Sequence, residues 1–258
     1  MIPTQTEAKF LPHSGGAPTC EDRLVPWRSG VWQFRFAGGS SVMAGIADRS
    51  CDLDGLRGHL ASAENLVLAE QVHSVSLAAV ETGTPPVLPI PGCDGLVTRA
   101  PGLALVIRTA DCLPIFVWDP IRRVIGLVHA GWRGLAGHLP QRLVSLLGIW
   151  YGSRPQDIRA GIGPAIRACC YEVGNEFANA FRPFLHERHG RLMCDLIGCA
   201  REQLYSSGVR PGHLSDCGAC TACEPTRWYS VRREGEGTGR LLSFIMIRPS
   251  QVTRTPRP

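Results

Sequence analysis

The chain has 258 residues, of which 44% are hydrophobic and 19% are charged, as in an ordinary globular protein with a sizeable core. No run of 18 apolar residues occurs, which argues against a membrane-spanning helix and a membrane partner. The first residues lack the charged and apolar regions of a secretory signal, so we expect a cytoplasmic protein.

The formal net charge is +5, from 27 Lys and Arg against 22 Asp and Glu, and Lys9 is the only lysine. No basic block with interleaved aromatic residues occurs, so we expect no nucleic-acid partner. A mild excess of arginine suits a small anionic substrate, because guanidinium groups match phosphate and carboxylate in geometry.

The first third of the chain has weak periodicity. Residues 1–30 are rich in Pro and Gly, and we expect a poorly ordered N-terminal arm there. Residues 64–81 read as two short strands that meet at His73. The Pro/Gly-rich stretch 82–93 is incompatible with a helix or a central strand, and we expect a loop.

Four short apolar runs follow, each bounded by Gly, Pro or Asp, at 95–98, 103–107, 113–118 and 124–130. Such runs are typical of buried strands. The period then changes, because Leu139, Leu143, Leu146, Leu147 and Trp150 lie on one face of a helix.

The last third mixes both kinds of element. We expect strands at 157–163, 228–233 and 240–247, helices at 175–185 and 195–208, and a flexible tail at 249–258. No repeat or composition break divides the chain, which favours one mixed α/β domain over residues 31–248.

Three residues with soft or borderline metal-ligand side chains lie at the ends of apolar runs: His73, Cys112 and His129. A catalytic zinc site uses three protein ligands and keeps its fourth position open for water or substrate. Singly, each residue is more often a hydrogen-bonded core histidine or an inert buried thiol.

The neighbours of these residues strengthen the interpretation. Asp111 precedes Cys112, and Asp94 precedes the strand 95–98. A carboxylate beside a metal site can shuttle a proton or orient a ligand histidine, although a turn or cap role is common. Arg133 follows Gly131 in a tight turn and is a candidate for contacting an anionic substrate, with a surface salt bridge as the alternative.

Several motifs, in this order and spacing, resemble those of the multicopper polyphenol oxidase-like family, also called the YfiH or laccase-domain family. The match covers about residues 65 to 247 and rests on "EQVHS", "CDGLVT", "TADCLPIF", "VHAGWRGL", "AGIGPAIRACCYEVGNEF", "CTAC" and "WYSVRREGEGTGR".

The resemblance implies an α+β fold, a single domain of packed mixed β-sheets flanked by helices. It also implies a zinc ion held by His73, Cys112 and His129. Members phosphorolyse adenosine, inosine or methylthioadenosine and deaminate adenosine; some are described as peptidoglycan editing factors or laccases. A laccase needs several coppers and many histidines, often in His-x-His pairs. None of the eight histidines forms such a pair, so copper is less favoured than zinc.

Substrate contacts are less specific in the sequence. Trp132, Phe116 and Tyr171 are candidates for stacking on a purine, although core packing is the commoner role for each. Arg233 and Arg240, with Arg232, fall in the motif "WYSVRREGEGTGR". They could pair with a substrate phosphate or tie the last strands to acidic neighbours.

Eleven cysteines is a high number, and in a reducing compartment they are expected as thiols or metal ligands rather than disulfides. Cys217, Cys220 and Cys223 are spaced by three. A second zinc site there would need a fourth ligand, such as Cys169 or Cys170.

Three functions are open. The leading one, which the family resemblance implies, is a zinc-dependent purine nucleoside phosphorylase with adenosine deaminase activity, whose partners are a purine nucleoside and phosphate. The second is a metal-free hydrolase of a peptidoglycan precursor that uses Cys112 and His129. The third is a non-enzymatic thiol or metal buffer. We expect a monomer or a weak homodimer.

Overall fold

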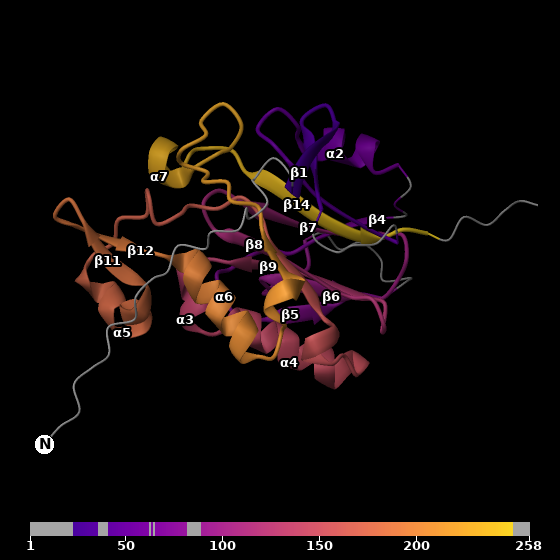
Figure 1. The fold of residues 1–258 in the computed structure, drawn as a ribbon. Helices are drawn as coiled ribbons and strands as arrows, with labels where there is room; N and C mark the ends of the chain where they lie inside the picture. The colour runs from indigo at the N-terminus through magenta and orange to yellow at the C-terminus, as the bar shows by residue number, and fades with distance from the viewer. Residues whose placement is uncertain (1–22, 36–40, 62, 64, 82–88, 250–258) are drawn as a thin grey trace, which may run out of the picture.

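The computed structural model describes residues 23–35, 41–61, 63, 65–81 and 89–249. Two six-stranded sheets lie at the centre, with helices on both sides (Figure 1). Both sheets are mixed, because each combines antiparallel pairs with one or two parallel pairs.

In the first sheet, the strands β14 and β7 pair antiparallel along nearly their whole length. Its order is β1 (Leu24–Arg28), β2 (Val31–Phe34), β3 (Val42–Ala47), β14 (Leu241–Ile247), β7 (Leu103–Thr109) and β4 (Asn65–Leu68). Every residue of β3 and β14 is buried, as expected for strands that are covered on both faces.

The second sheet is built around the antiparallel pair of β8 and β9, in which all residues are buried. Its order is β13 (Leu214–Asp216), β10 (Arg159–Ile162), β8 (Leu113–Asp119), β9 (Val124–Ala130), β6 (Gly95–Thr98) and β5 (Leu77–Ala79).

The core forms three layers of contact. Residues such as Ile107 and Ile245 of the first sheet pack with Phe116 and Leu127 of the second, which joins the two sheets. The outer face of the first sheet packs on α2 (Leu53–His59). The outer face of the second sheet packs on α3 (Trp132–Ala136), α4 (Leu139–Tyr151) and α6 (Leu196–Ser206). The expected fold class, packed mixed sheets flanked by helices, is confirmed.

Most of the predicted elements are also confirmed. The four apolar runs are β6, β7, β8 and β9, and the helix with leucines on one face is α4. The strands that were expected to meet at His73 are β4 and β5. The other predicted helix, 195–208, is α6, and the last apolar run is β14.

The strand predicted at 228–233 is wrong. The short helix α7 (Val231–Glu234) begins there instead, and the hydroxyl of Ser230 caps it by accepting a hydrogen bond from the backbone N–H of Arg233. An N-cap of this kind satisfies a backbone donor that a strand would pair with its neighbour.

The helix predicted at 175–185 is only partly formed. It divides into η2 (Asn175–Phe177), the single turn α5 (Ala178–Phe181) and η3 (Arg182–Phe184), followed by the hairpin of β11 (Leu185–Arg188) and β12 (Arg191–Cys194). Pro183 explains the break, because proline lacks the N–H that a continuing helix requires. Two further 3₁₀ turns are η1 (Pro155–Asp157) and η4 (Pro211–His213).

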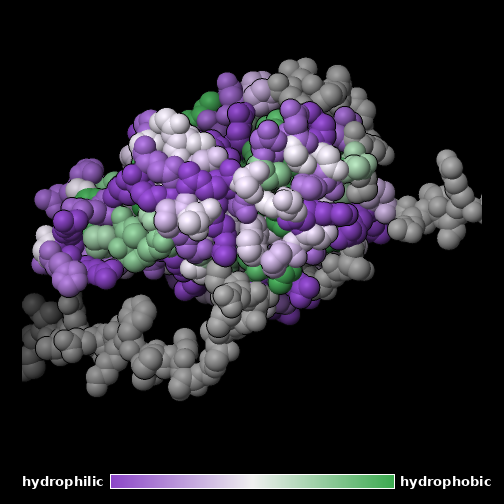
Figure 2. All heavy atoms as spheres, turned by 90° about the horizontal axis from the view of Figure 1, so that it is seen from above, coloured by the Kyte–Doolittle hydropathy of each residue, from purple (hydrophilic) through white to green (hydrophobic). Residues whose placement is uncertain are grey.

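The predicted end of the N-terminal arm at residue 30 is too late, because β1 already pairs with β2 in the first sheet. Residues 1–22 and the tail from 250 lie outside the described residues. In the described ranges, no helix is both long and apolar enough to cross a membrane. The face of the molecule seen from above is mainly hydrophilic (Figure 2).

Candidate metal centre and cavity

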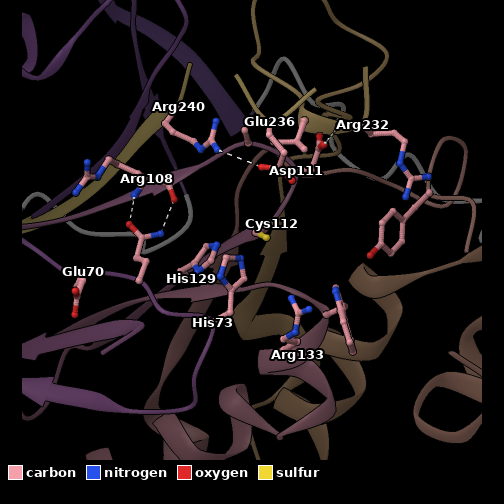
Figure 3. A pocket seen from close by; sticks show the side chains of 15 residues that line it. Glu70, His73, Arg108, Asp111, Cys112, His129, Arg133, Arg232, Glu236 and Arg240 are labelled. Atoms are coloured by element: carbon pink, nitrogen blue, oxygen red, sulfur yellow. Dashed lines mark hydrogen bonds and ion pairs between the residues drawn. The ribbon is translucent and has the colours of Figure 1, made fainter. Parts of the chain in front are cut away.

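The three candidate ligands converge at one point. His73 lies in the loop after β4, Cys112 lies in the turn between β7 and β8, and His129 is the sixth residue of β9. One donor atom from each lies within 4.8 Å of the other two, and the two imidazole rings are 4.9 Å apart between centroids. Figure 3 shows the three side chains pointing toward one another.

The β8–β9 pairing explains why Cys112 meets His129. Leu113 pairs with Ala130 and Pro114 with His129, so the turn before β8 lies beside the end of β9. Gly131 continues that end, and a Cβ atom there would lie 2.9 Å from Cys112 Sγ and 3.4 Å from the His73 ring. Any larger residue at this position would occupy the space among the ligands.

Asp94 holds two of the ligands from behind. Its carboxylate is fully buried and accepts hydrogen bonds from the backbone N–H groups of Val72, His73 and Ser74, and from the Ser74 hydroxyl. It also accepts one from His129 Nδ1 at 2.9 Å, which leaves His129 Nε2 to face the other ligands. Asp94 lies behind the ligands and is not among the residues that line the adjoining cavity.

His73 depends on this support. Its backbone has φ 59°, in the left-handed region that non-glycine residues adopt only at a cost. The backbone N–H groups of Val72, His73 and Ser74 all donate to the Asp94 carboxylate, and these three hydrogen bonds hold the loop in this conformation.

The ionisation of Cys112 favours metal binding, whereas His129 must give up a proton to a bound metal ion, because its pKa is raised. Burial alone would raise the pKa of the Cys112 thiol, but hydrogen bonds from His129 and His73 outweigh it and lower the pKa to about 7. Burial alone would lower the pKa of His129, but hydrogen bonds to Asp94 and Cys112 raise it to about 9. Burial likewise opposes the charge on Asp94, and its hydrogen bonds with His129 and Ser74 lower its pKa. A thiolate at neutral pH is the form of cysteine that binds metals.

The ligands open onto a cavity of about 710 Å³, which lies within the usual size range of small-molecule sites. Its charged and polar wall residues come from both sheets and from the loops around α7: Glu70, Gln71, His73, Arg108, Asp111, Cys112, His129, Arg133, Tyr171, Arg232, Glu236 and Arg240. Four arginines therefore face three carboxylates.

Asp111 lines this cavity, but both of its oxygens already accept hydrogen bonds. Thr221 Oγ1 donates to one oxygen at 2.6 Å, and the backbone N–H of Arg232 donates to the other at 2.7 Å. The φ angle of Asp111 is 86°, a second left-handed residue beside the ligands. Asp111 thus joins the end of β7 to the two C-terminal loops of the site.

Arg133 and Trp132 form the wall on the α3 side. The guanidinium of Arg133 lies 4.4 Å from the centroid of the Trp132 ring, and Trp132 is 37% exposed. In the part of the chain that is described, Arg133 forms no ion pair, so its donors remain available in the cavity. The alternative role, a surface salt bridge, therefore has no partner among the described residues.

Tyr171 also lines the cavity, with the guanidinium of Arg232 5.0 Å from its ring centroid. Burial raises the pKa of Tyr171 to about 12, so the phenol is neutral and can donate a hydrogen bond. Tyr171 and Trp132 both border a smaller adjoining pocket that also contains Phe177. Phe116, in contrast, is fully buried between the two sheets and does not reach the cavity.

The three arginines of the C-terminal motif separate into different roles. Arg233 forms contacts within the protein, because its guanidinium donates to the carbonyls of Thr221, Ala222 and Trp228 and pairs with Glu234. Arg232 and Arg240 line the cavity instead. The two roles considered for Arg233 were binding a substrate phosphate and holding the last strands to their neighbours. The structure favours the second, because the side chain of Arg233 points from α7 toward residues 221–228.

Arg108 was missed in the sequence. It is the one exposed residue of β7, and its backbone exchanges two hydrogen bonds with the side chain of Gln71, the residue two before His73. A charged residue within the apolar run "LALVIRT" was the available signal, since the other six side chains of that strand are buried.

The donor set fits zinc. Two imidazoles and one thiolate from separate strand ends leave one side open to the cavity, which is the arrangement of catalytic zinc sites. The absent Cβ of Gly131 keeps the space between the donors clear. Asp94 supplies the carboxylate partner that zinc-bound histidines commonly have.

A second group of thiols lies outside the cavity. Cys169, Cys170, Cys220 and Cys223 bring their sulfur atoms within 4.8 Å of one another. The sequence places Cys217 at the same spacing as Cys220 and Cys223, but Cys217 does not belong to this group of four. Cys217 is fully buried and extends β13, where its N–H donates to the carbonyl of Ile162.

Comparison with known proteins agrees with the resemblance. A family model described as "Multi-copper polyphenol oxidoreductase laccase" matches residues 53–248. "Purine nucleoside phosphorylase YlmD" of Geobacillus stearothermophilus is 36% identical over 197 residues, covering 70% of this chain and 72% of that protein. "Adenosine deaminase RL5" of an unknown prokaryotic organism is 30% identical over 197 residues, covering 70% and 75%.

A solved structure of YlmD from Geobacillus stearothermophilus superposes with a TM-score of 0.82 at 29% sequence identity. The superposition covers 88% of this chain and 99% of that chain. The region that the family model matches, residues 53–248, includes the candidate metal centre, the residues that line the cavity and the four-cysteine group. The chain belongs to the multi-copper polyphenol oxidoreductase laccase family.

Proposed function

We propose that this protein is a zinc-dependent purine nucleoside phosphorylase that also deaminates adenosine. The observation that carries the proposal is the position of the three metal ligands on the wall of a cavity that also presents Arg133 and three further arginines. Relatives named "Purine nucleoside phosphorylase YlmD" and "Adenosine deaminase RL5" support the same two reactions. The substrates of the proposal are adenosine, inosine and methylthioadenosine.

The cavity is large enough for both substrates, since about 710 Å³ exceeds what a nucleoside alone requires. Arg133 is the candidate phosphate ligand, because its guanidinium lines the cavity beside Trp132 and, among the described residues, pairs with no carboxylate. Trp132 and Tyr171 both line the cavity and the adjoining pocket, and they offer aromatic surface for the purine.

His73, Cys112 and His129 would hold the zinc ion. When bound, the ion supplies a Lewis acid that polarises an oxygen of the substrate or of an attacking group. Asp94 fixes His129 and the His73 loop as a positioning residue, because it contacts ligands and not the cavity. Asp111, a carboxylate on the cavity wall, is the candidate proton acceptor, and it accepts hydrogen bonds from Thr221 and from the backbone of Arg232.

In phosphorolysis, a phosphate oxygen forms a bond to the ribose C1′ while the bond from C1′ to the purine nitrogen breaks and the purine takes up a proton. In deamination, water adds to C6 of adenine and ammonia leaves. The first reaction needs a phosphate site and the second does not. One cavity that offers both arginines and aromatic rings accommodates both reactions.

Oxidation by several coppers is not supported by the ligands. Among the described residues, only two groups of potential ligands converge, and only the cavity group contains histidine. The metal-free alternative, in which Cys112 attacks a peptidoglycan precursor, uses the same thiolate and imidazole. The metal-free mechanism predicts that zinc-free protein is active, whereas the zinc-dependent mechanism predicts that it is inactive.

Product analysis of adenosine incubated with the protein tests the proposal. With phosphate, we expect adenine and ribose 1-phosphate; without phosphate, we expect inosine and ammonia alone. The Cys112→Ala variant is expected to give neither. Adenine release that does not depend on phosphate, or no turnover of adenosine by zinc-loaded protein, would contradict the assignment.

A further inference from the structure

A second cluster of ligands lies in loops that border the cavity but do not line it with their sulfur atoms. Cys169 and Cys170 lie in the loop after β10, and Cys220 and Cys223 lie in the loop after β13. The Sγ–Sγ distances are 3.6 Å from Cys169 to Cys220, 3.6 Å from Cys169 to Cys223 and 3.4 Å from Cys170 to Cys223.

These distances match a shared metal ion better than a disulfide. A disulfide requires about 2.0 Å between sulfurs. A tetrahedral zinc ion with Zn–S bonds of about 2.3 Å places its four sulfurs about 3.8 Å apart. All four sulfurs here lie within 4.8 Å of one another, so small side-chain movements would complete the tetrahedron.

Core packing does not account for the cluster. Cys169 and Cys223 are exposed and Cys170 is half-buried, whereas only Cys220 is buried. Cys194 and Cys199, in contrast, are buried among apolar side chains and serve as core residues. Four thiols that converge at a partly exposed site gain little from burial.

The backbone around the sulfurs is already ordered. The N–H of Cys170 donates to the carbonyl of Arg167, and the N–H of Cys223 donates to the carbonyl of Cys220, so each loop makes a tight turn. A bridge between Ala165 and Cys220 pairs the two loops in parallel. The spacing from Cys220 to Cys223 is that of the C-x₂-C pairs of structural zinc sites.

We propose that Cys169, Cys170, Cys220 and Cys223 bind a second zinc ion with a structural role. Four thiolates close the coordination sphere, so this ion has no open position for a substrate. The guanidinium of Arg188 donates to the carbonyl of Cys169 at 3.5 Å and places a positive charge beside the four thiolates.

The ion would fix the far wall of the cavity. Tyr171 follows Cys170 directly, and Thr221, which donates to Asp111, lies between Cys220 and Cys223. The ion would thus hold together two loops that are about 50 residues apart in sequence. The inference does not depend on which reaction the cavity catalyses.

Metal analysis of protein purified with a reducing agent tests this site. We expect two zinc ions per chain in the wild type, one in Cys112→Ala and one in Cys223→Ser. Cys51→Ser is the matched control, because Cys51 is a partly exposed thiol far from both groups, and it should keep two. Cys223→Ser should also unfold at a lower temperature than the control.

Cobalt provides a measurement that does not depend on the folding of Cys223→Ser. The Cys112→Ala protein, loaded with Co²⁺ alone, should display the intense thiolate-to-cobalt charge-transfer band of a four-thiolate tetrahedral site. One zinc in the wild type and none in Cys112→Ala would overturn the proposal. A disulfide between these cysteines in alkylated, unreduced protein would overturn it as well.

Discussion

Two groups of potential metal ligands lie in the molecule, and they differ in number, origin and openness. The cavity group has three donors, from β9, from the turn before β8 and from the loop after β4, and a buried carboxylate, Asp94, supports two of them. The four-cysteine group has four donors, all from two loops, with hydrogen-bonded turns as its support. Three donors leave a position free for chemistry, whereas four leave none.

The difference in origin has a physical reason. A reacting group must be held in place to a fraction of an ångström, and the buried β8–β9 pair together with the buried Asp94 carboxylate provides that precision. The four cysteines lie in two loops that are far apart in sequence. A closed metal site there would join these loops to each other. The comparison therefore predicts that loss of the first group removes activity and that loss of the second removes order.

The largest expected effect comes from the cavity ligands. His73→Ala, Cys112→Ala and His129→Ala should each strip one zinc ion and reduce phosphorolysis by about 1000-fold or more, because metal catalysis contributes several kcal/mol. The fold should remain largely intact, as judged by circular dichroism. A variant that keeps its full zinc content would remove that residue from the ligand set.

Asp94→Asn sharpens the difference between ligand and support. The amide keeps the shape of the carboxylate but loses the charge and one acceptor, and Asp94 accepts five hydrogen bonds. We expect zinc affinity at the cavity group to fall by about 10- to 100-fold, with the four-cysteine zinc unchanged. Saturating zinc should restore much of the activity. Full loss of activity at saturating zinc would mean that Asp94 acts in the reaction itself.

Arg133→Lys separates the two activities. Lysine keeps the positive charge but not the two-pronged guanidinium, so phosphorolysis should fall by about 10- to 100-fold, equivalent to about 1.5–3 kcal/mol. Deamination uses water and should fall much less. Adenine and inosine release from adenosine, measured on one preparation, give both rates.

Arg232→Lys is the comparison variant for Arg133→Lys, since Arg232 also lines the cavity but lies over Tyr171. Equal loss of both activities in Arg133→Lys would assign that arginine to the nucleoside or to the fold. No loss of either would make Arg108, Arg232 and Arg240 the next candidates for phosphate.

The smallest effect is expected for Cys217→Ser. Cys217 has the same three-residue spacing as Cys220 and Cys223, but its backbone extends β13 and its side chain is buried away from the cluster. Zinc content and both activities should stay nearly at wild-type values. The loss of one zinc ion from a folded, active variant would contradict the assignment of the cluster ligands.

These two regions also differ in how far the sequence predicts them. Cys112 and His129 lie at the ends of apolar runs so regular that the strands β7 to β9 are predictable, and His73 lies between two predicted strands. The cysteine cluster depends on how two loops meet. Spacing alone therefore included Cys217 and could not choose between Cys169 and Cys170, both of which belong to the cluster.

Local signals explain the other differences. The run "WYSVRR" has strand-like composition, but Ser230 caps a helix, so Arg233 turns into the loop and Arg232 reaches the cavity. The hairpin of β11 and β12 turns at His189 and Gly190, both with positive φ, a signal that was hidden within a polar stretch. Neither the role of Asp94 as a buried acceptor nor that of Arg108 follows from periodicity, because both depend on contacts between distant segments.

The most direct test of the account is phosphate-dependent adenine release from adenosine, followed while a chelator removes zinc from the wild-type protein and zinc is then added back. The account predicts that activity falls in proportion to the zinc lost from the cavity group and returns when that zinc is restored. Full phosphate-dependent adenine release from protein with no zinc at His73, Cys112 and His129 would contradict it.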